Sequence, residues 1–172
     1  GYRGHMDDDE NEEGRQPIVP IRLQDHLVWQ VQLSHLSERE QALVGWLIES
    51  LDEAGYLPVP LSDFVDMGAD EEELRIALCY LQSLEPLGVG ARDVRECLLL
   101  QLNAQPLTPA VELARLMVSE HLALLANRDF SKLKRLLKCE DDALRAAHLC
   151  IMQLNPRPAA DFAAPNTEYV VP

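Results

Sequence analysis

Residues 37–55 read SEREQALVGWLIESLDEAG, and this stretch decides the fold class. Ser37 stands three residues before Glu40, which is the spacing of a capping box that starts a helix. Five apolar side chains then follow at the spacing of one helix face: Leu43, Val44, Leu47, Ile48 and Leu51. Gly55 suits the left-handed conformation that ends a helix, and two prolines just beyond it prevent the helix from resuming. The stretch therefore predicts a helix with one buried face.

Similar start signals recur along the chain. Three further pairs predict helix starts. Asp70 with Glu73 and Asp93 with Glu96 have the spacing of a capping box, and Thr108 offers a cap with Pro109 at the first helical position. Apolar residues keep the helical period between these points, and aromatic residues make up only 5% of the sequence. Such a leucine-rich composition favours helices over sheets. We therefore expect an all-α protein with about seven to nine helices and almost no sheet.

The apolar stripes also predict where later helices end. One long stripe from Val111 to Leu125 is interrupted at Asn127, and the last helix is expected to run through Leu154. The polar segment from Asn103 to Pro109, which contains two prolines, is the expected join between two small helical subdomains. The predicted organisation is a disordered acidic linker at 1–17 that begins with a possible cloning remnant, a first subdomain at 18–105, a second at 106–158, and a linker at 159–172 that leads to something not included in this sequence.

Charge and composition narrow the class of partner. The formal net charge of the 172 residues is −14, so binding to nucleic acid by the chain alone is disfavoured, whereas a protein partner with basic patches fits. The four cysteines form no CxxC pair and are expected to be reduced core thiols. No apolar run reaches the length that spans a bilayer, and no signal peptide is recognisable, so the sequence predicts a cytoplasmic protein without membrane contact.

The sequence contains no pattern typical of catalysis or of cofactor binding. His26, His121 and His148 lie in helical stripes, where a packed histidine is the expected role, and no HExxH motif or phosphate-binding loop is present. Gly88 and Gly90 form a GxG without a following lysine, so we expect a sharp turn before Asp93. We predict no enzyme activity, cofactor, metal or small-molecule ligand.

One segment is basic within this acidic chain. Five cations fall within eleven residues, opposed by a single acid: Arg128, Lys132, Lys134, Arg135 and Lys138. On a helix, three of them would share a face. Two interpretations remain open, a solvated helix face or a patch for an acidic protein surface or DNA phosphates.

Six short stretches of sequence occur in an order that is far more specific than any one of them alone. They read LQDHL (23–27), LDEAGYL (51–57), EPLGVGARDVRECL (85–98), HLALLANRDF (121–130), LNPRP (154–158) and TEYVVP (167–172). This series resembles the core-binding region of the bacterial sigma-fifty-four (RpoN) transcription initiation factors, and the resemblance covers about residues 23–172. The acidic stretch before Ile18 is similar to the linker that precedes this region in the family. Ala159 departs from the glycine that usually follows the LNPRP phrase, so a tight glycine turn is not expected there.

The resemblance implies a function in transcription initiation. It implies that the fragment binds core RNA polymerase, chiefly the β-subunit flap and the β′ clamp region, in activator-dependent initiation. It also implies that 159–172 is a linker to a DNA-binding part outside this sequence. In the full-length protein, promoter DNA and an activator ATPase would be further partners. We expect the polymerase-facing residues near the glycine turn and in the basic segment: Val89, Arg92, Asp93, Arg95, Asn127, Arg128, Asp129, Lys132 and Arg135. The alternatives are a generic helical adaptor for another complex and, less well supported, a small enzyme with a polar pocket.

Overall fold

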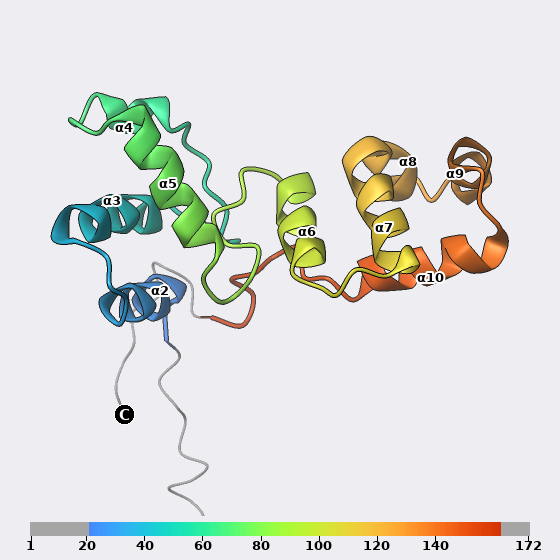
Figure 1. The fold of residues 1–172 in the computed structure, drawn as a ribbon, viewed down its shortest axis with the longest axis horizontal. Helices are drawn as coiled ribbons and strands as arrows, with labels where there is room; N and C mark the ends of the chain where they lie inside the picture. Colours follow the sequence, from blue (N-terminus) through green and yellow to red (C-terminus); the bar gives the residue numbers. More distant parts are fainter. Residues whose placement is uncertain (1–20, 163–172) are drawn as a thin grey trace, which may run out of the picture.

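The computed structural model describes residues 21–162, which form helices joined by turns and loops (Figure 1). The helices are α2 (Leu23–Gln32), α3 (Glu38–Glu49), α4 (Ser62–Val65), α5 (Glu71–Gln82), α6 (Val94–Asn103), α7 (Pro109–Glu120), α8 (Leu122–Ala126), α9 (Phe130–Leu137) and α10 (Asp141–Met152). The predicted all-α class and the predicted number of helices are confirmed for the described part of the chain. The predictions for 1–17 and for 163–172 lie outside these residues.

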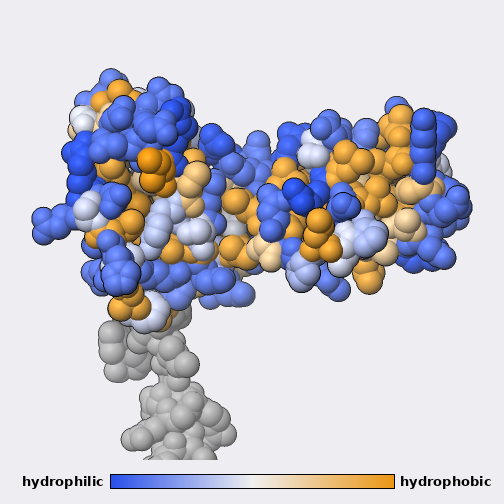
Figure 2. Space-filling model, in the orientation of Figure 1, coloured by the Kyte–Doolittle hydropathy of each residue, from blue (hydrophilic) through white to orange (hydrophobic). Residues whose placement is uncertain are grey.

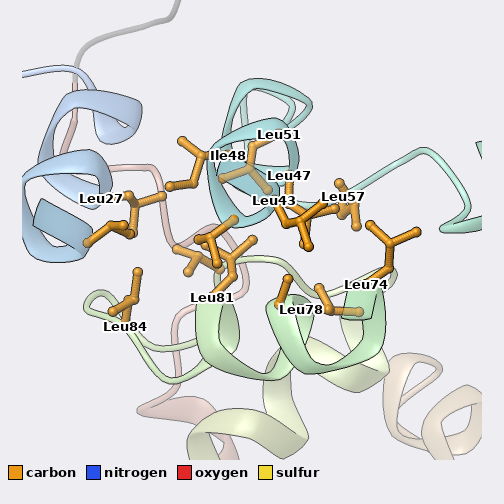
Figure 3. Close-up of a cluster of buried hydrophobic side chains, with 14 of the residues drawn as sticks. Leu27, Leu43, Leu47, Ile48, Leu51, Leu57, Leu74, Leu78, Leu81 and Leu84 are labelled. Carbon is orange, nitrogen blue, oxygen red and sulfur yellow. The ribbon is translucent and has the colours of Figure 1, made fainter. Parts of the chain in front are cut away.

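The first lobe consists of α2 to α5. Figure 3 shows its core, where leucines of α3 and α5 face one another and Leu27 of α2 closes one side. Leu27, Leu47 and Leu81 have no exposed surface. Each such side chain contributes about 1.5–3 kcal/mol through its removal from water. The stripe read from residues 37–55 is therefore the buried face that it predicts, because α3 packs on both α2 and α5.

The second lobe consists of α6 to α10. Its core is built around α7, which packs against α6 on one side and α10 on the other. The buried residues at this centre come from four helices: Leu98, Leu102, Ala114, Met117, Val118, Leu133, Leu144 and Ala147. Figure 1 shows the two lobes side by side along the long axis, with α6 next to the first lobe and α9 at the far end.

The two buried clusters place α6 with the second lobe. The first cluster includes Val89 and the second begins at Leu98, so the change of core falls in the loop before α6. The sequence-based division at 105/106 cuts instead between α6 and α7, which pack on each other. We propose that the boundary lies within 90–93, because helices that share a core belong to one unit.

The predicted helix starts are found in the structure. The Ser37 hydroxyl accepts a hydrogen bond from the Glu40 N–H at 3.1 Å, and the Glu40 carboxylate accepts one from the Ser37 N–H at 2.8 Å. The Asp93 carboxylate accepts from the N–H of Glu96 at 2.8 Å, and the Thr108 hydroxyl caps α7 in the same way at 3.1 Å. These bonds satisfy N–H groups that have no partner inside the helix.

Three expected helix ends are wrong. Helix α3 ends at Glu49, and Gly55 lies in a separate turn beyond it. The stripe from Val111 to Leu125 is divided between α7 and α8, because His121 leaves the helical region of backbone conformation. Helix α10 ends at Met152, before Leu154, although Leu154 still packs against the core of the second lobe. Apolar periodicity continues across each break, which explains why the sequence did not reveal them.

The structure corrects one further expectation and adds one observation. Only Cys97 is buried among the cysteines, whereas Cys79 is exposed and Cys139 and Cys150 are half-buried. None of the helices described is long and apolar enough to cross a membrane.

Candidate functional site

The chain returns from the second lobe to the first after α10. Figure 1 shows this segment passing beneath α6 toward α2. The N–H of Ala159 donates to the carbonyl of Ala54 at 3.1 Å, and the Ala159 side chain is buried in the first core. No positive φ is found at Ala159, so alanine is compatible with this backbone, as the departure from glycine predicts. The two lobes are thus joined by two chain crossings, the loop before α6 and this return segment.

A glutamine of α6 holds the return segment. The Gln101 amide nitrogen donates to the carbonyl of Asn155 at 2.6 Å, and the Asn155 N–H donates to the Gln101 amide oxygen at 2.8 Å. The pair copies the two-point pairing of a β-ladder with a side chain in place of a strand. A second glutamine does the same within the first lobe, where Gln30 of α2 pairs with both backbone groups of Glu85 at 2.5 and 3.0 Å.

The turn at Gly55 meets the glycine loop before α6. The Gly90 N–H donates to the carbonyl of Gly55 at 2.9 Å, and the Leu57 N–H donates to the carbonyl of Ala91 at 2.8 Å. The Tyr56 hydroxyl donates to the carbonyl of Pro156 at 2.5 Å. Burial, followed by the neighbouring Cys97, raises the pKa of this phenol to about 12, so the hydroxyl keeps its proton and remains a donor.

Gly88 is required by both its backbone and its surroundings. Its φ of +103° lies outside the conformations that side-chain-bearing residues adopt readily. A Cβ atom at this position would lie 2.8 Å from the Cys97 Sγ and 2.9 Å from the Gln101 amide nitrogen. The predicted turn is therefore found, with positive φ at Gly88 and Gly90, and the glycine also permits the return segment to approach. Burial raises the pKa of the Cys97 thiol, which favours its protonated, uncharged form.

We call this contact region the junction; it comprises Gly55–Tyr56, Gly88–Ala91, Cys97, Gln101 and Asn155–Ala159. Three of the quoted phrases, at 51–57, 85–98 and 154–158, therefore meet at one place although they are far apart in the sequence. Their residues hold the two lobes together, so a large part of the sequence pattern serves the architecture of the domain.

The residues that we predicted near the glycine turn divide into buried and exposed positions. Val89 has no exposed surface and packs in the first core, so its predicted contact with a partner would require this side chain to leave the core. Arg92 is exposed, and its pKa is raised by the Glu96 carboxylate that it contacts at 2.9 Å. The Asp93 carboxylate is used as the cap of α6. Arg95 is exposed on the same helix, and its guanidinium reaches the carbonyl of Val118 at 3.4 Å.

The second group lies at the far end of the second lobe. All five residues are exposed: Asn127, Arg128, Asp129, Lys132 and Arg135. Arg128 precedes α9 and has a left-handed φ of 58°, so the face that we expected it to share with Lys132 on one helix is not formed. Asp129 caps α9 by accepting from the Lys132 N–H at 3.2 Å. The basic side chains themselves point away from the core, since Leu133 is the fully buried residue of this helix.

The structure separates charge between the lobes. Residues 21–93 carry fourteen acidic and four basic side chains, which gives a formal charge of −10. Residues 94–154 carry seven acidic and eight basic side chains, which gives +1. The negative charge that the composition shows for the whole chain is thus a property of the first lobe and the N-terminal segment, and the second lobe can approach an anion.

Sequence reasoning missed a groove between α3 and α5. It has a volume of about 120 Å³ and is lined mainly by apolar side chains, with two glutamates on its rim: Leu36, Glu40, Leu43, Val44, Glu73, Ile76, Ala77 and Tyr80. Ile76 is 57% exposed beside it. Figure 2 shows such apolar surface, in orange, among polar residues on both lobes. Ile76 interrupts the polar face of α5, which is the signal that could have revealed the site.

Comparison with known proteins identifies the family. Residues 16–172 match the family model described as the sigma-54 factor, core binding domain. The chain belongs to this family. It is 42% identical over 155 residues to the RNA polymerase sigma-54 factor of Escherichia coli (strain K12), covering 87% of this chain and 32% of that protein. It is also 37% identical over 172 residues to the factor of Pseudomonas aeruginosa (strain UCBPP-PA14), covering 96% of this chain and 35% of that protein.

The chain spans about a third of the length of these curated relatives. Within residues 21–162, no group of three or more histidine, cysteine, aspartate or glutamate side chains could hold a metal ion. The resemblance inferred from the six phrases is confirmed.

Proposed function

We propose that this domain binds core RNA polymerase and thereby attaches an alternative sigma factor to the enzyme in the bacterial cytoplasm. The observation that carries the proposal is the family match, which extends over residues 16–172. The β flap and the β′ clamp region are the proposed contacts on the polymerase. Promoter DNA and an activator ATPase are proposed partners of the full-length factor.

The first proposed contact surface is the α3–α5 groove. An apolar side chain from the polymerase can enter between Val44 and Ile76, where it would replace exposed hydrocarbon with buried contact. Glu40 and Glu73 also line the groove; Glu73 is already paired with Arg39 at 2.6 Å, so Glu40 is the acid that favours a basic residue beside that apolar side chain. The occupant that we propose is therefore a helical segment of core polymerase with an apolar anchor flanked by lysine or arginine.

The second proposed contact is the exposed start of α6. Arg92, Asp93 and Arg95 border a shallow hollow that also includes Leu99. Arg95 is the residue there whose guanidinium is exposed and makes no ion pair among residues 21–162. A polymerase carboxylate could pair with it without breaking the Arg92–Glu96 ion pair.

Two exposed residues of the first lobe provide a matched test. Ile76 lies at the groove and Met67 lies away from it, and both are 57% exposed. Binding of the fluorescently labelled chain to purified core polymerase is measured for Ile76→Asp and Met67→Asp. We expect the first change to weaken binding by about tenfold or more, and the second to leave it within about twofold. Equal affinities for both variants would refute the groove as a contact, and no binding by the unmodified chain would refute the proposed function itself.

A further inference from the structure

The second lobe carries a run of cations on and beside α9. We call these residues the α9 basic face; Lys132 and Arg135 lie on the helix, Arg128 and Lys138 lie just before and just after it, and all four are exposed. None of the four makes an ion pair with another residue in the described part of the chain, whereas Lys134 of the same helix is paired with Asp141 at 2.9 Å. The one acid at the start of α9, Asp129, already accepts a backbone hydrogen bond. No ion pair within the described residues therefore occupies these four cations.

Two of these cations occupy backbone conformations that glycine adopts more easily. Arg128 has a φ of 58° and Lys138 a φ of 53°, and they are the non-glycine residues with positive φ between Ile21 and Phe162. Arg128 occupies the position that glycine usually takes in a helix-ending motif. Its N–H donates to the Leu125 carbonyl at 3.1 Å, and the Asp129 N–H donates to the Leu124 carbonyl at 2.9 Å. Folding alone would favour glycine at such positions. Arg128 and Lys138 therefore destabilise the backbone relative to glycine, and a binding role of their side chains would explain why they stand there.

The surroundings of the α9 basic face favour phosphates over an acidic protein. Protein interfaces are usually anchored by an aromatic or aliphatic side chain that enters a pocket. On α9 a single large apolar side chain, Leu136 at 47%, is exposed beside four exposed cations, so charge and not apolar contact dominates this surface. Contacts to a nucleic-acid backbone need only exposed cations at suitable spacing. From these observations we propose that the α9 basic face binds the phosphate backbone of duplex DNA without reading its sequence.

The difference in charge between the lobes determines which end of the molecule DNA would contact. The first lobe, with a formal charge of −10, repels phosphates, and the second lobe at +1 does not. DNA is therefore held along the end of the molecule opposite to the α3–α5 groove. The contact is weak for the isolated chain, because the total charge is −14. It becomes effective when the domain is already held close to DNA, since the local concentration of phosphates is then high.

The test uses a short DNA duplex of arbitrary sequence and residue-resolved NMR of the 172-residue chain at low salt. We expect shifts of the backbone amides in 128–139 and none in α2 to α5. Lys132→Gln/Arg135→Gln removes two charges from the α9 basic face, and Arg75→Gln/Arg115→Gln removes two exposed charges elsewhere. The first variant should lose about tenfold or more in affinity, with a salt dependence lower by about two phosphate contacts, and the second should retain both.

Arg128→Gly separates binding from folding. If the side chain serves DNA, this variant binds the duplex less tightly while its melting temperature stays the same or rises. A variant that melts lower and binds unchanged would show that Arg128 has a purely structural role, and this would overturn the proposal. Equal losses of affinity for the duplex in both double variants would show that binding depends on net charge and not on the α9 basic face. Equal shifts with a poly-glutamate peptide would assign the face to an acidic protein instead.

Discussion

Gly88→Ala tests how firmly the junction holds the two lobes. The substitution introduces one carbon atom, which would lie 2.8 Å from the Cys97 Sγ and 2.9 Å from the amide nitrogen of Gln101. Both distances are too short for a stable contact. Gln101 must therefore move, and its two hydrogen bonds to Asn155 are lost or lengthened.

The expected cost has two parts. A residue with a side chain at a φ of +103° costs about 1–2 kcal/mol relative to glycine. Loss of two hydrogen bonds costs about 1–3 kcal/mol in net terms. The free energy of unfolding should fall by about 2–5 kcal/mol, and for a chain of this size the melting temperature should fall by about 4–20 °C.

Substitutions at two other glycines distinguish the backbone cost from the cost of the lost hydrogen bonds. Gly68 has a φ of +97° but nothing within 4 Å of an added Cβ, so Gly68→Ala should cost about 1–2 kcal/mol from the backbone alone. Gly45 lies inside α3 with no neighbour within 4 Å and no positive φ, so Gly45→Ala should stabilise the fold by about 0.5–1 kcal/mol.

Thermal unfolding and hydrogen exchange are the assays. Thermal unfolding ranks the three variants, and hydrogen exchange reports on the Asn155 amide, which donates to Gln101. Exchange at Asn155 should accelerate in Gly88→Ala and stay slow in Gly68→Ala. If Gly88→Ala costs no more than Gly68→Ala, or leaves Asn155 protected, the side-chain contact at the junction does not hold the return segment and this reasoning is wrong.

Three further outcomes follow from single contacts. Gln101→Ala should accelerate hydrogen exchange at Asn155 as Gly88→Ala does, and an unchanged rate would contradict the pairing. Hydrogen bonds from Arg39 and from the N–H of Asp70 lower the pKa of Glu73 to about 2 from 4.5, so this carboxylate stabilises the fold above pH 4.5 and that contribution is lost as the pH falls toward 2. Glu73→Gln should make acid unfolding over that interval less steep, and a profile parallel to that of the unmodified chain would exclude the effect. Thr108→Ala removes the cap of α7 and should cost about 1 kcal/mol in urea unfolding, whereas no change in midpoint would mean that solvent replaces the cap.

The helix starts could be predicted because their signals are local. Ser37, Asp93 and Thr108 each act on an N–H three residues away, so sequence spacing is sufficient to identify them. Helix ends were less predictable. The division at His121 lies within an unbroken apolar stripe, and only the packing of α8 against both α7 and α9 distinguishes it.

The junction could not be predicted from local signals. The two glycines could be recognised as a turn, but the partner of that turn is Gly55, thirty-five residues before Gly90. The glutamine that holds the return segment is an ordinary helix residue in the sequence, since its partner Asn155 is fifty-four residues away. Val89 shows the opposite error, because a valine between two glycines in a loop suggested exposure and the fold buries it.

The basic segment was predicted only in part from its charge pattern. Its composition could be read from the sequence, and the structure adds that four of the five cations are exposed, while the fifth, Lys134, pairs with Asp141. It also places Arg128 outside the helix. A helical wheel treats every residue as helical, and so it cannot show a left-handed residue at a helix end.

The central claim is tested most directly by the affinity of the purified 172-residue chain for core RNA polymerase, measured in solution near physiological salt. We expect saturable binding by the unmodified chain, retained in Met67→Asp and weakened by about tenfold or more in Ile76→Asp. A folded chain that does not bind core polymerase at micromolar concentrations would contradict it.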